Sequence, residues 1–198
     1  MTDALVRKAD AYASLAHLGQ WRVEALGPAC GVGYIEHPRA VARILLTMHP
    51  DPALHTSLVQ QIALLHRTLW RGNADPDQLE LVFGREVAAA VRLLSPWLRA
   101  RPATHKDEDT YWPRLPRAPR VIRAVVGAAW LDDLDAASRW PQAFDNAALH
   151  AEVEARVLPL LRDDPWLSMM LEASLDAAAD LGAGDDAHAE APYGADDD

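Results

Sequence analysis

The sequence has a single cysteine, no long apolar run and fewer basic than acidic residues. One cysteine, Cys30, excludes an internal disulfide and any zinc site built from several cysteines. No run of about 18 apolar residues is present, so no segment is expected to span a bilayer. Residues 1–20 carry several charges among short apolar steps and lack the pattern of a signal peptide. These absences favour a cytoplasmic protein.

Charge is unevenly distributed along the chain. The sequence holds 29 acidic and 19 basic residues, and its net charge of −10 argues against bulk nucleic acid or an anionic membrane surface as a partner. Six acids and no Lys or Arg lie in residues 183–198, which leaves −4 for the rest. This tail has no periodic apolar face, so we predict that it is disordered and solubilises the chain. Residues 99–123 are locally basic and would either attract anions or form an ordinary solvated stretch.

Apolar residues recur at helical spacing, and neither strand alternation nor an internal repeat is present. Half of the 198 residues are hydrophobic, which is enough for a packed core. Asp75 before Pro76 is typical of an N-cap, and Phe83–Gly84 is expected to bend the helix that follows. The periodic stretches predict helices over residues 4–20, 38–48, 54–70, 76–94, 117–140, 146–161 and 166–181. The sequence therefore predicts one compact all-α domain of seven or eight helices over residues 1–182.

Four segments carry motifs in a fixed order. They are AHLGQWRV (16–23), YIEHPRAVARIL (34–45), QIALLHRTLWRGNADPDQLELVFGREVAAAV (61–91) and APRVIRAVVGAAWLDDL (118–134). Together they resemble the HD-type hydrolase domain of the RelA/SpoT family, whose patterns read AHxGQxRK, YIxHPxxVAxIL, ALLHDxxEDT with FGxEV, and KLADRLDNL. That family comprises metal-dependent (p)ppGpp pyrophosphohydrolases, including small stand-alone alarmone hydrolases. The resemblance implies an HD-like helical fold.

The resemblance also implies a particular site. The family holds a divalent metal, typically manganese, with two histidines and two aspartates, and the metal activates a water. A Glu-Asp pair handles protons, and an arginine contacts the nucleotide. The two metal histidines match His37 and His66, and the nucleotide-contacting arginine matches Arg22. Asp132 matches a further acid that the family also has.

Most of the remaining family residues are replaced. The aspartate of the HD pair becomes Arg67, the Glu-Asp pair becomes Trp70 and Arg71, and the last metal aspartate becomes Ala129. Two neutral imidazoles without a carboxylate hold a divalent ion poorly, and a fixed positive charge beside them opposes it. We therefore predict no metal cofactor, no catalytic residue and no hydrolysis, so that the chain is a pseudoenzyme.

The basic replacements favour a binding role. Arg67 and Arg71 lie four residues apart on one predicted helix and so share a face, where they would meet Arg22. Arginine side chains bind phosphate groups through two parallel hydrogen bonds. The first hypothesis is that the domain binds a guanine or adenine polyphosphate, or another phosphorylated ligand, without cleaving it. Its site residues would be Arg22, His37, His66, Arg67, Arg71 and Asp132.

Other interpretations of the same residues stay open. Arg67 and Arg71 would instead lock the core by pairing with acids of the fourth segment, namely Asp132, Asp133 or Asp135. Without a metal, His37 and His66 would be vestigial ligand positions held as buried structural histidines. A domain without catalysis would also suit a protein-interaction module, such as an antitoxin, an immunity protein or a regulatory subunit, because its acidic surplus fits a basic partner. A third class is an active pyrophosphohydrolase whose histidines recruit Asp132 or Asp133 and rebuild a metal site.

Overall fold

The structure is a computed structural model that describes residues 4–96 and 105–185. Helices dominate this part of the chain, and an isolated antiparallel bridge joins Trp21 to Gly33. The α-helices are α1 (Ala4–Ala16), α2 (Glu36–Arg43), α3 (Ser57–Leu65), α4 (Pro76–Leu93), α5 (His105–Arg114), α6 (Arg120–Arg139), α7 (Asn146–Glu152) and α8 (Pro165–Asp185). The predicted all-α fold class is confirmed, with eight α-helices among the described residues.

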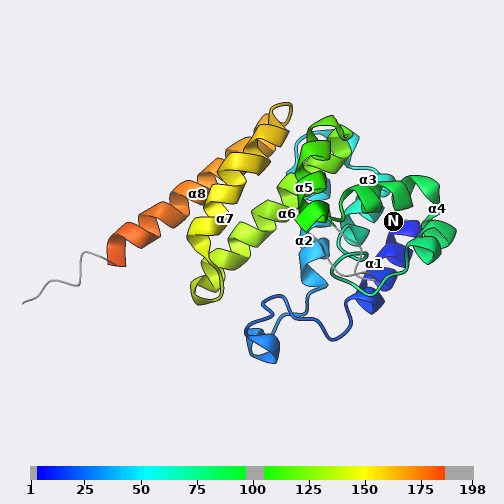
Figure 1. Cartoon of the computed structure of the whole chain (residues 1–198), viewed down its shortest axis with the longest axis horizontal. Coiled ribbons are helices and arrows are strands. Elements are labelled where there is room, and N and C mark those ends of the chain that lie inside the picture. The colour runs from blue at the N-terminus through cyan, green and yellow to red at the C-terminus, as the bar shows by residue number, and fades with distance from the viewer. Residues whose placement is uncertain (1–3, 97–104, 186–198) are drawn as a thin grey trace, which may run out of the picture.

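A long central helix organises the domain. α6 packs against α2, α3 and α8, while α1 packs on α3. Figure 1 shows α6 and α8 side by side at one end of an elongated molecule, with α1 to α4 gathered toward the other end. After α7 the chain continues in two short helical turns, Val153–Val157 and Leu158–Leu161, before α8 reverses its direction.

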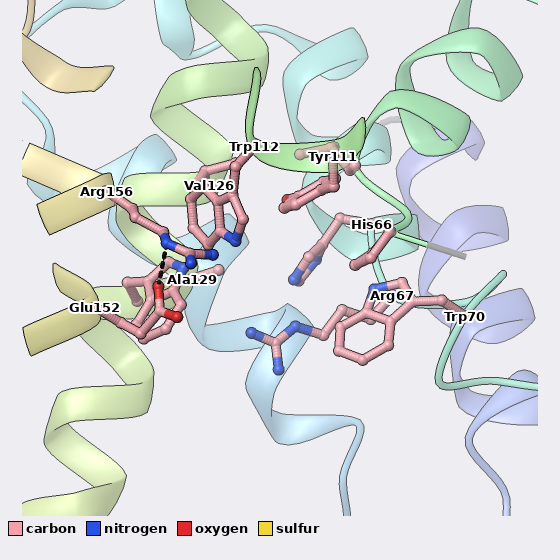
Figure 2. Close-up of a pocket in the computed structure, with 12 residues that line it drawn as sticks. His66, Arg67, Trp70, Tyr111, Trp112, Val126, Ala129, Glu152 and Arg156 are labelled. Carbon is pink, nitrogen blue, oxygen red and sulfur yellow. Dashed lines mark ion pairs between the residues drawn. The ribbon is translucent and has the colours of Figure 1, made fainter. Parts of the chain in front are cut away.

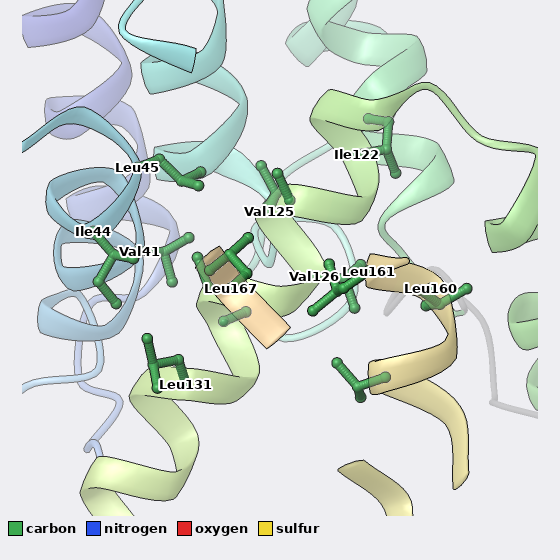
Figure 3. Packing of buried hydrophobic residues seen from close by; sticks show 14 of the residues in the cluster. Val41, Ile44, Leu45, Ile122, Val125, Val126, Leu131, Leu160, Leu161 and Leu167 are labelled. Atoms are coloured by element: carbon green, nitrogen blue, oxygen red, sulfur yellow. The ribbon is translucent and has the colours of Figure 1, made fainter. Parts of the chain in front are cut away.

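Two clusters of buried apolar side chains hold the helices together. The larger cluster lies between α2, α6 and the start of α8, and Figure 3 shows its centre. Its fully buried members include Val41, Leu45, Val125, Leu161 and Leu167. The smaller cluster joins α1, α3 and α4 and includes Val6, Leu65, Leu79 and Val87. Burying an aliphatic side chain of this size contributes about 1.5–3 kcal/mol, so these clusters fix how the helices pack.

The lack of a side chain at Gly127 sets how closely α6 approaches the turn before α8. A Cβ atom at this position would lie 2.8 Å from Cδ1 of Leu161 and 3.3 Å from Cδ1 of Leu167. Both distances are short for carbon atoms in a close-packed core, so glycine permits the contact.

A buried polar pair fastens the loop after α2 to the start of α8. Nε2 of His49 lies 2.9 Å from Oδ1 of Asp164, and both side chains are 2% exposed. The N–H of Asp51 donates to Nδ1 of His49, so Nε2 carries the proton and donates to Asp164. Arg120 bonds both Asp51 and Asp164, so at least one residue of the basic stretch 99–123 forms internal ion pairs.

The helix predicted over residues 54–70 is shorter than expected. α3 ends at Leu65, and residues 66–71 form turns in which the N–H of Arg71 bonds to the carbonyl of Arg67. Arg67 and Arg71 therefore do not lie on a helix as expected, although both side chains still contact Tyr34. Contacts of this segment with other helices outweigh its local helix preference.

No helix was expected at α5. Its sequence, HKDEDTYWPR, lacks an apolar period and contains Pro113, so the periodic pattern carries no helix signal there. Tyr111 and Trp112 in its last turns pack on the larger cluster. Packing against the larger cluster therefore stabilises α5, although its sequence has no helical pattern of apolar residues.

α8 continues to Asp185, past the predicted start of the tail at residue 183. Residues 186–198 lie outside the described residues, so the disorder of the tail stays a prediction. Within residues 4–96 and 105–185, no helix is both long enough and apolar enough to cross a bilayer.

Both local signals predicted for α4 are confirmed. Oδ1 of Asp75 accepts hydrogen bonds from the N–H groups of Asp77 and Gln78, each at 2.9 Å. Gly84 interrupts the helix with φ 84° and ψ 165°. Only glycine adopts these angles without strain, which explains the bend.

We expect Gly84→Ala to lower the free energy of unfolding by about 1–3 kcal/mol, because a Cβ atom is strained at this φ. Gly33→Ala is the matched control, since Gly33 has no positive φ and a Cβ there would meet only Ile35, at 3.9 Å. Urea unfolding of both variants measures the difference. Equal losses in the two variants would contradict the strained geometry at Gly84.

Candidate functional site

Four parts of the chain bring charged and polar side chains to one place. Arg22 comes from the loop after α1, His37 from the first turn of α2, Arg67 from the turn after α3, and Asp132 and Asp133 from α6. None of these five side chains is more than 16% exposed. We call them the charged cluster. Its geometry depends on the packing of α2 and α3 against α6.

The loop after α1 holds Arg22 in the charged cluster. The backbone N–H of Arg22 donates to the carbonyl of Val32 at 2.8 Å, which closes the loop between them. Nη2 of Arg22 then donates to Oδ2 of Asp132 at 2.8 Å and to Oδ1 of Asp133 at 2.9 Å. One guanidinium group thus bridges the two carboxyl groups of α6.

Arg67 forms a buried ion pair with Asp133. Its Nη2 lies 2.5 Å from Oδ2 of Asp133, and its Nη1 donates to the hydroxyl of Tyr34 at 2.9 Å. Burial alone would lower the pKa of Arg67 and raise the pKa of Asp133. Their mutual attraction, with Arg22 adding to it at Asp133, overcomes burial, so the pKa of Arg67 is raised and that of Asp133 is lowered. Both groups are charged, and Arg67 has the predicted alternative partner, an acid of α6.

His37 and His66 form a chain of hydrogen bonds that ends on Asp132. Nδ1 of His37 lies 2.7 Å from Oδ2 of Asp132, and the Nε2 atoms of the two histidines lie 3.2 Å apart. Nδ1 of His66 lies 2.6 Å from the carbonyl of Ala63, to which it donates, so its Nε2 is an acceptor. When Asp132 is protonated, it can donate to Nδ1 of His37, and Nε2 of His37 can then donate to His66.

Burial places this shared proton on the carboxyl group. It raises the pKa of Asp132 to about 6. Burial, followed by the charge of Arg67, lowers the pKa of His37 well below its usual value and that of His66 to about 3. The histidines are therefore neutral, and Asp132 keeps its proton up to about pH 6. The expectation that both histidines lack a carboxyl partner is wrong for His37, whereas His66 bonds the backbone.

Arg71 stands apart from the charged cluster. Its guanidinium lies over the ring of Tyr34, 4.3 Å from the centroid, and its Nη2 lies 3.4 Å from Oε2 of Glu24. The alternative that Arg71 pairs with an acid of α6 stays a prediction. Glu24 is largely exposed, so its ion pair contributes little to stability.

Two cavities lie beside the charged cluster and share the side chains of Arg67 and Trp130. The arginine cavity has a volume of about 290 Å³, and its other lining residues include Arg22, Arg71, Asp133 and Phe144. The aromatic cavity, drawn in Figure 2, has a volume of about 260 Å³, and its other lining residues include His66, Trp70, Tyr111, Trp112 and Arg156. Among the site residues predicted from the sequence, Asp132 and His37 line neither cavity and lie behind the arginines.

Sequence reasoning missed part of the cavity walls. Tyr111 and Trp112 lie on α5, which was not predicted, while Phe144 and Arg156 follow the last of the four motif segments. The sequence carries no signal for these four residues, because aromatic and basic side chains at helical spacing are most often ordinary core or surface residues.

Known proteins are similar to this chain over part or most of its length. No family model matches it. A stretch of 95 residues, 48% of the chain, is 36% identical to proteins named GTP pyrophosphokinase rsh from Brucella melitensis and Brucella ovis, of whose length the chain spans 11%. A solved structure described as "A metazoan ortholog of SpoT hydrolyzes ppGpp and plays a role in starvation responses" is similar over 90% of this chain and 97% of that chain, with a TM-score of 0.74 and 18% identity. The chain has the fold of an HD-type ppGpp hydrolase.

The residues present do not fit the divalent metal that the resemblance of the four sequence motifs implies. Among the described residues, one group of three could offer ligand atoms to an ion: His37, Asp132 and Asp133. Arg22 already bridges both carboxyl groups, and Arg67 binds Asp133. A cation would have to enter beside two fixed positive charges and displace their hydrogen bonds, which is unfavourable in a buried site.

We expect the domain to lose stability as the pH falls from about 6.5 to about 4. Because the pKa values of His37 and His66 are lowered, the unfolded chain binds more protons in this range, and acid favours unfolding. The raised pKa of Asp132 acts the other way, because the folded protein keeps a proton there that the unfolded chain releases above about pH 4. Two histidines outweigh one carboxyl group, so the net effect of acid over this range is a loss of stability.

Asp132→Asn removes the carboxyl group whose raised pKa opposes destabilisation by acid. The stability of this variant should therefore fall more steeply than that of the wild type over the same pH range. Asp176→Asn is the matched control, because Asp176 is exposed on α8 and is not among the charges that raise the pKa of Asp132. Denaturant unfolding at a series of pH values measures the slopes. An Asp132→Asn curve parallel to that of the wild type would contradict the raised pKa of Asp132.

Proposed function

We propose that this domain binds a phosphorylated nucleotide, a guanine or adenine polyphosphate, without metal-dependent hydrolysis. The observation that carries the proposal is the buried Arg67–Asp133 ion pair. It puts a fixed cation at the position where the resemblance expects a metal-binding aspartate. The hydrolase fold supports the class of ligand, while the ion pair argues against the metal chemistry.

The described residues of the charged cluster are poorly placed to activate a water. Activation at neutral pH needs a metal-bound water or a carboxylate that is available to accept a proton. The lowered pKa of Asp133 makes it a weak base, and its oxygens already accept hydrogen bonds from Arg22 and Arg67. Asp132 is engaged by Arg22 and His37. These contacts support binding without catalysis.

The arginine cavity offers the contacts that a nucleotide needs. A guanidinium has five N–H donors, and Arg22 binds α6 through its Nη2 alone, so it keeps donors for phosphate oxygens. Arg71 lines the same cavity with its guanidinium over the ring of Tyr34, which adds a further positive charge to the cavity wall. The ring of Phe144 forms another part of the wall and supplies a flat apolar surface for a base.

The comparisons indicate which nucleotides to test first. The similar solved structure belongs to a protein described as hydrolysing ppGpp, and the Brucella relatives are named GTP pyrophosphokinase. These names support ppGpp and GTP as first ligands, with ATP as the adenine counterpart.

We expect the purified chain to bind ppGpp in isothermal titration calorimetry with a dissociation constant below about 1 mM. Chromatography should show ppGpp intact after incubation with Mn²⁺. Arg71→Ala is expected to weaken binding about tenfold, because it removes a charge-assisted hydrogen bond to phosphate. Arg139→Ala is the matched control, since Arg139 pairs with Asp135 on the surface of α6 and lines neither cavity.

Three outcomes would contradict this proposal. Mn²⁺-dependent release of pyrophosphate from ppGpp, lost in His66→Ala, would establish an active hydrolase instead. Stoichiometric manganese or zinc in the purified protein would show that the cluster accepts a metal after all. The absence of heat with ppGpp, GTP and ATP at millimolar concentration would rule out nucleotide binding and favour the interaction-module hypothesis.

A further inference from the structure

The two cavities meet at a shared arginine. Arg67 and Trp130 line both of them, with the arginine cavity on one side and the aromatic cavity on the other. We infer that the two cavities form one binding site for a dinucleoside polyphosphate, a ligand with a base at each end and a phosphate chain between the two nucleosides. This inference rests on the proposed function, because it adds a second base site to the first.

Neither cavity alone is large for a small-molecule site. Their volumes are about 290 and 260 Å³, whereas ligand sites usually measure about 300–1,000 Å³. Joined across Arg67, the cavities reach that range. A ligand that fills both must be long, with a narrow middle where Arg67 and Trp130 stand.

Aromatic rings line both ends of this joint site. Phe144 lies in the arginine cavity, and the aromatic cavity contains Trp70, Tyr111 and Trp112. The rings of Trp112 and Trp130 lie 6.2 Å apart and those of Tyr111 and Trp112 lie 5.3 Å apart, so they form a continuous wall. A base that stacks on such rings gains about 1–3 kcal/mol, whichever base it is. The site therefore has a place for a flat ring at each end.

The distribution of charge decides which part of the ligand lies where. Arg67 lies over the ring of Trp70, 5.4 Å from the centroid, and Arg156 lies over the ring of Trp112 at the same distance. Figure 2 shows these two pairs on opposite sides of the aromatic cavity, with Glu152 beside Arg156.

Glu152 makes the far end of the aromatic cavity unsuitable for phosphate. Its carboxylate lies 3.2 Å from Nε of Arg156, so it neutralises that arginine and repels a terminal phosphate. The same carboxylate can accept a hydrogen bond from the amino group of a base. Arg67 is itself paired with Asp133, but Arg22 and Arg71 line the arginine cavity together with it, so the phosphate chain belongs there and the far end of the aromatic cavity takes the second base.

Calorimetric titration of the full chain with dinucleoside tetraphosphates and with ATP and GTP tests this arrangement. We expect diadenosine or diguanosine tetraphosphate to bind at least about tenfold more tightly than the matching mononucleotide, because the second base adds its own stacking energy. Trp112→Ala should remove this advantage, whereas Trp112→Phe, which keeps a ring, should retain it. Trp140→Ala is the control, because Trp140 lines neither cavity, and it should keep the wild-type ratio.

The measurement on the wild type is decisive even where a variant fails to fold. Equal affinities of the wild type for the two kinds of ligand would overturn the inference and leave the proposed function intact. If folded Trp112→Ala still binds the dinucleoside tetraphosphate more tightly than the mononucleotide by the wild-type factor, the inference is overturned as well, because the second base would then lie elsewhere. Binding of neither kind of ligand would contradict the proposed function together with the inference.

Discussion

The buried ion pair between Arg67 and Asp133 is the interaction on which the candidate site depends. It joins the turn after α3 to α6 across 66 residues of sequence. Two buried charges are tolerated only when further hydrogen bonds satisfy them, and here Tyr34 and Arg22 supply those bonds. Either charge alone would be costly to bury, so the pair constrains where the turn and the helix lie relative to each other.

The same pair explains why two adjacent carboxyl groups behave differently. Asp133 lies against two guanidinium groups, and its pKa is lowered. At Asp132 burial outweighs the one arginine, and the pKa rises to about 6. The carboxyl group of Asp132 lies within hydrogen-bond distance of His37, which in turn contacts His66. The histidine and the two aspartates have the composition of a metal site, but arginine side chains rather than a metal ion bind their carboxyl groups.

Fold and site carry different information about function. The similarity to the solved ppGpp hydrolase covers 90% of the chain and concerns the path of the backbone, while 18% identity means that most side chains differ. A fold supports many activities, and chemistry is decided by the residues at the site. Here arginines and tryptophans stand where the resemblance expects acids. Such a combination suits phosphate groups and flat rings, which is the basis of the proposed binding role.

The sequence by itself determined the helical fold class and the local signals that start or bend a helix. Asp75 and Gly84 act on the backbone within a few residues, so their effects were predicted correctly. Only the tertiary structure decided the partner of Arg67, the position of Arg71 over the ring of Tyr34, and the existence of α5. Helix preferences act between residues three or four apart, whereas ion pairs, burial and pKa values depend on which distant segments meet.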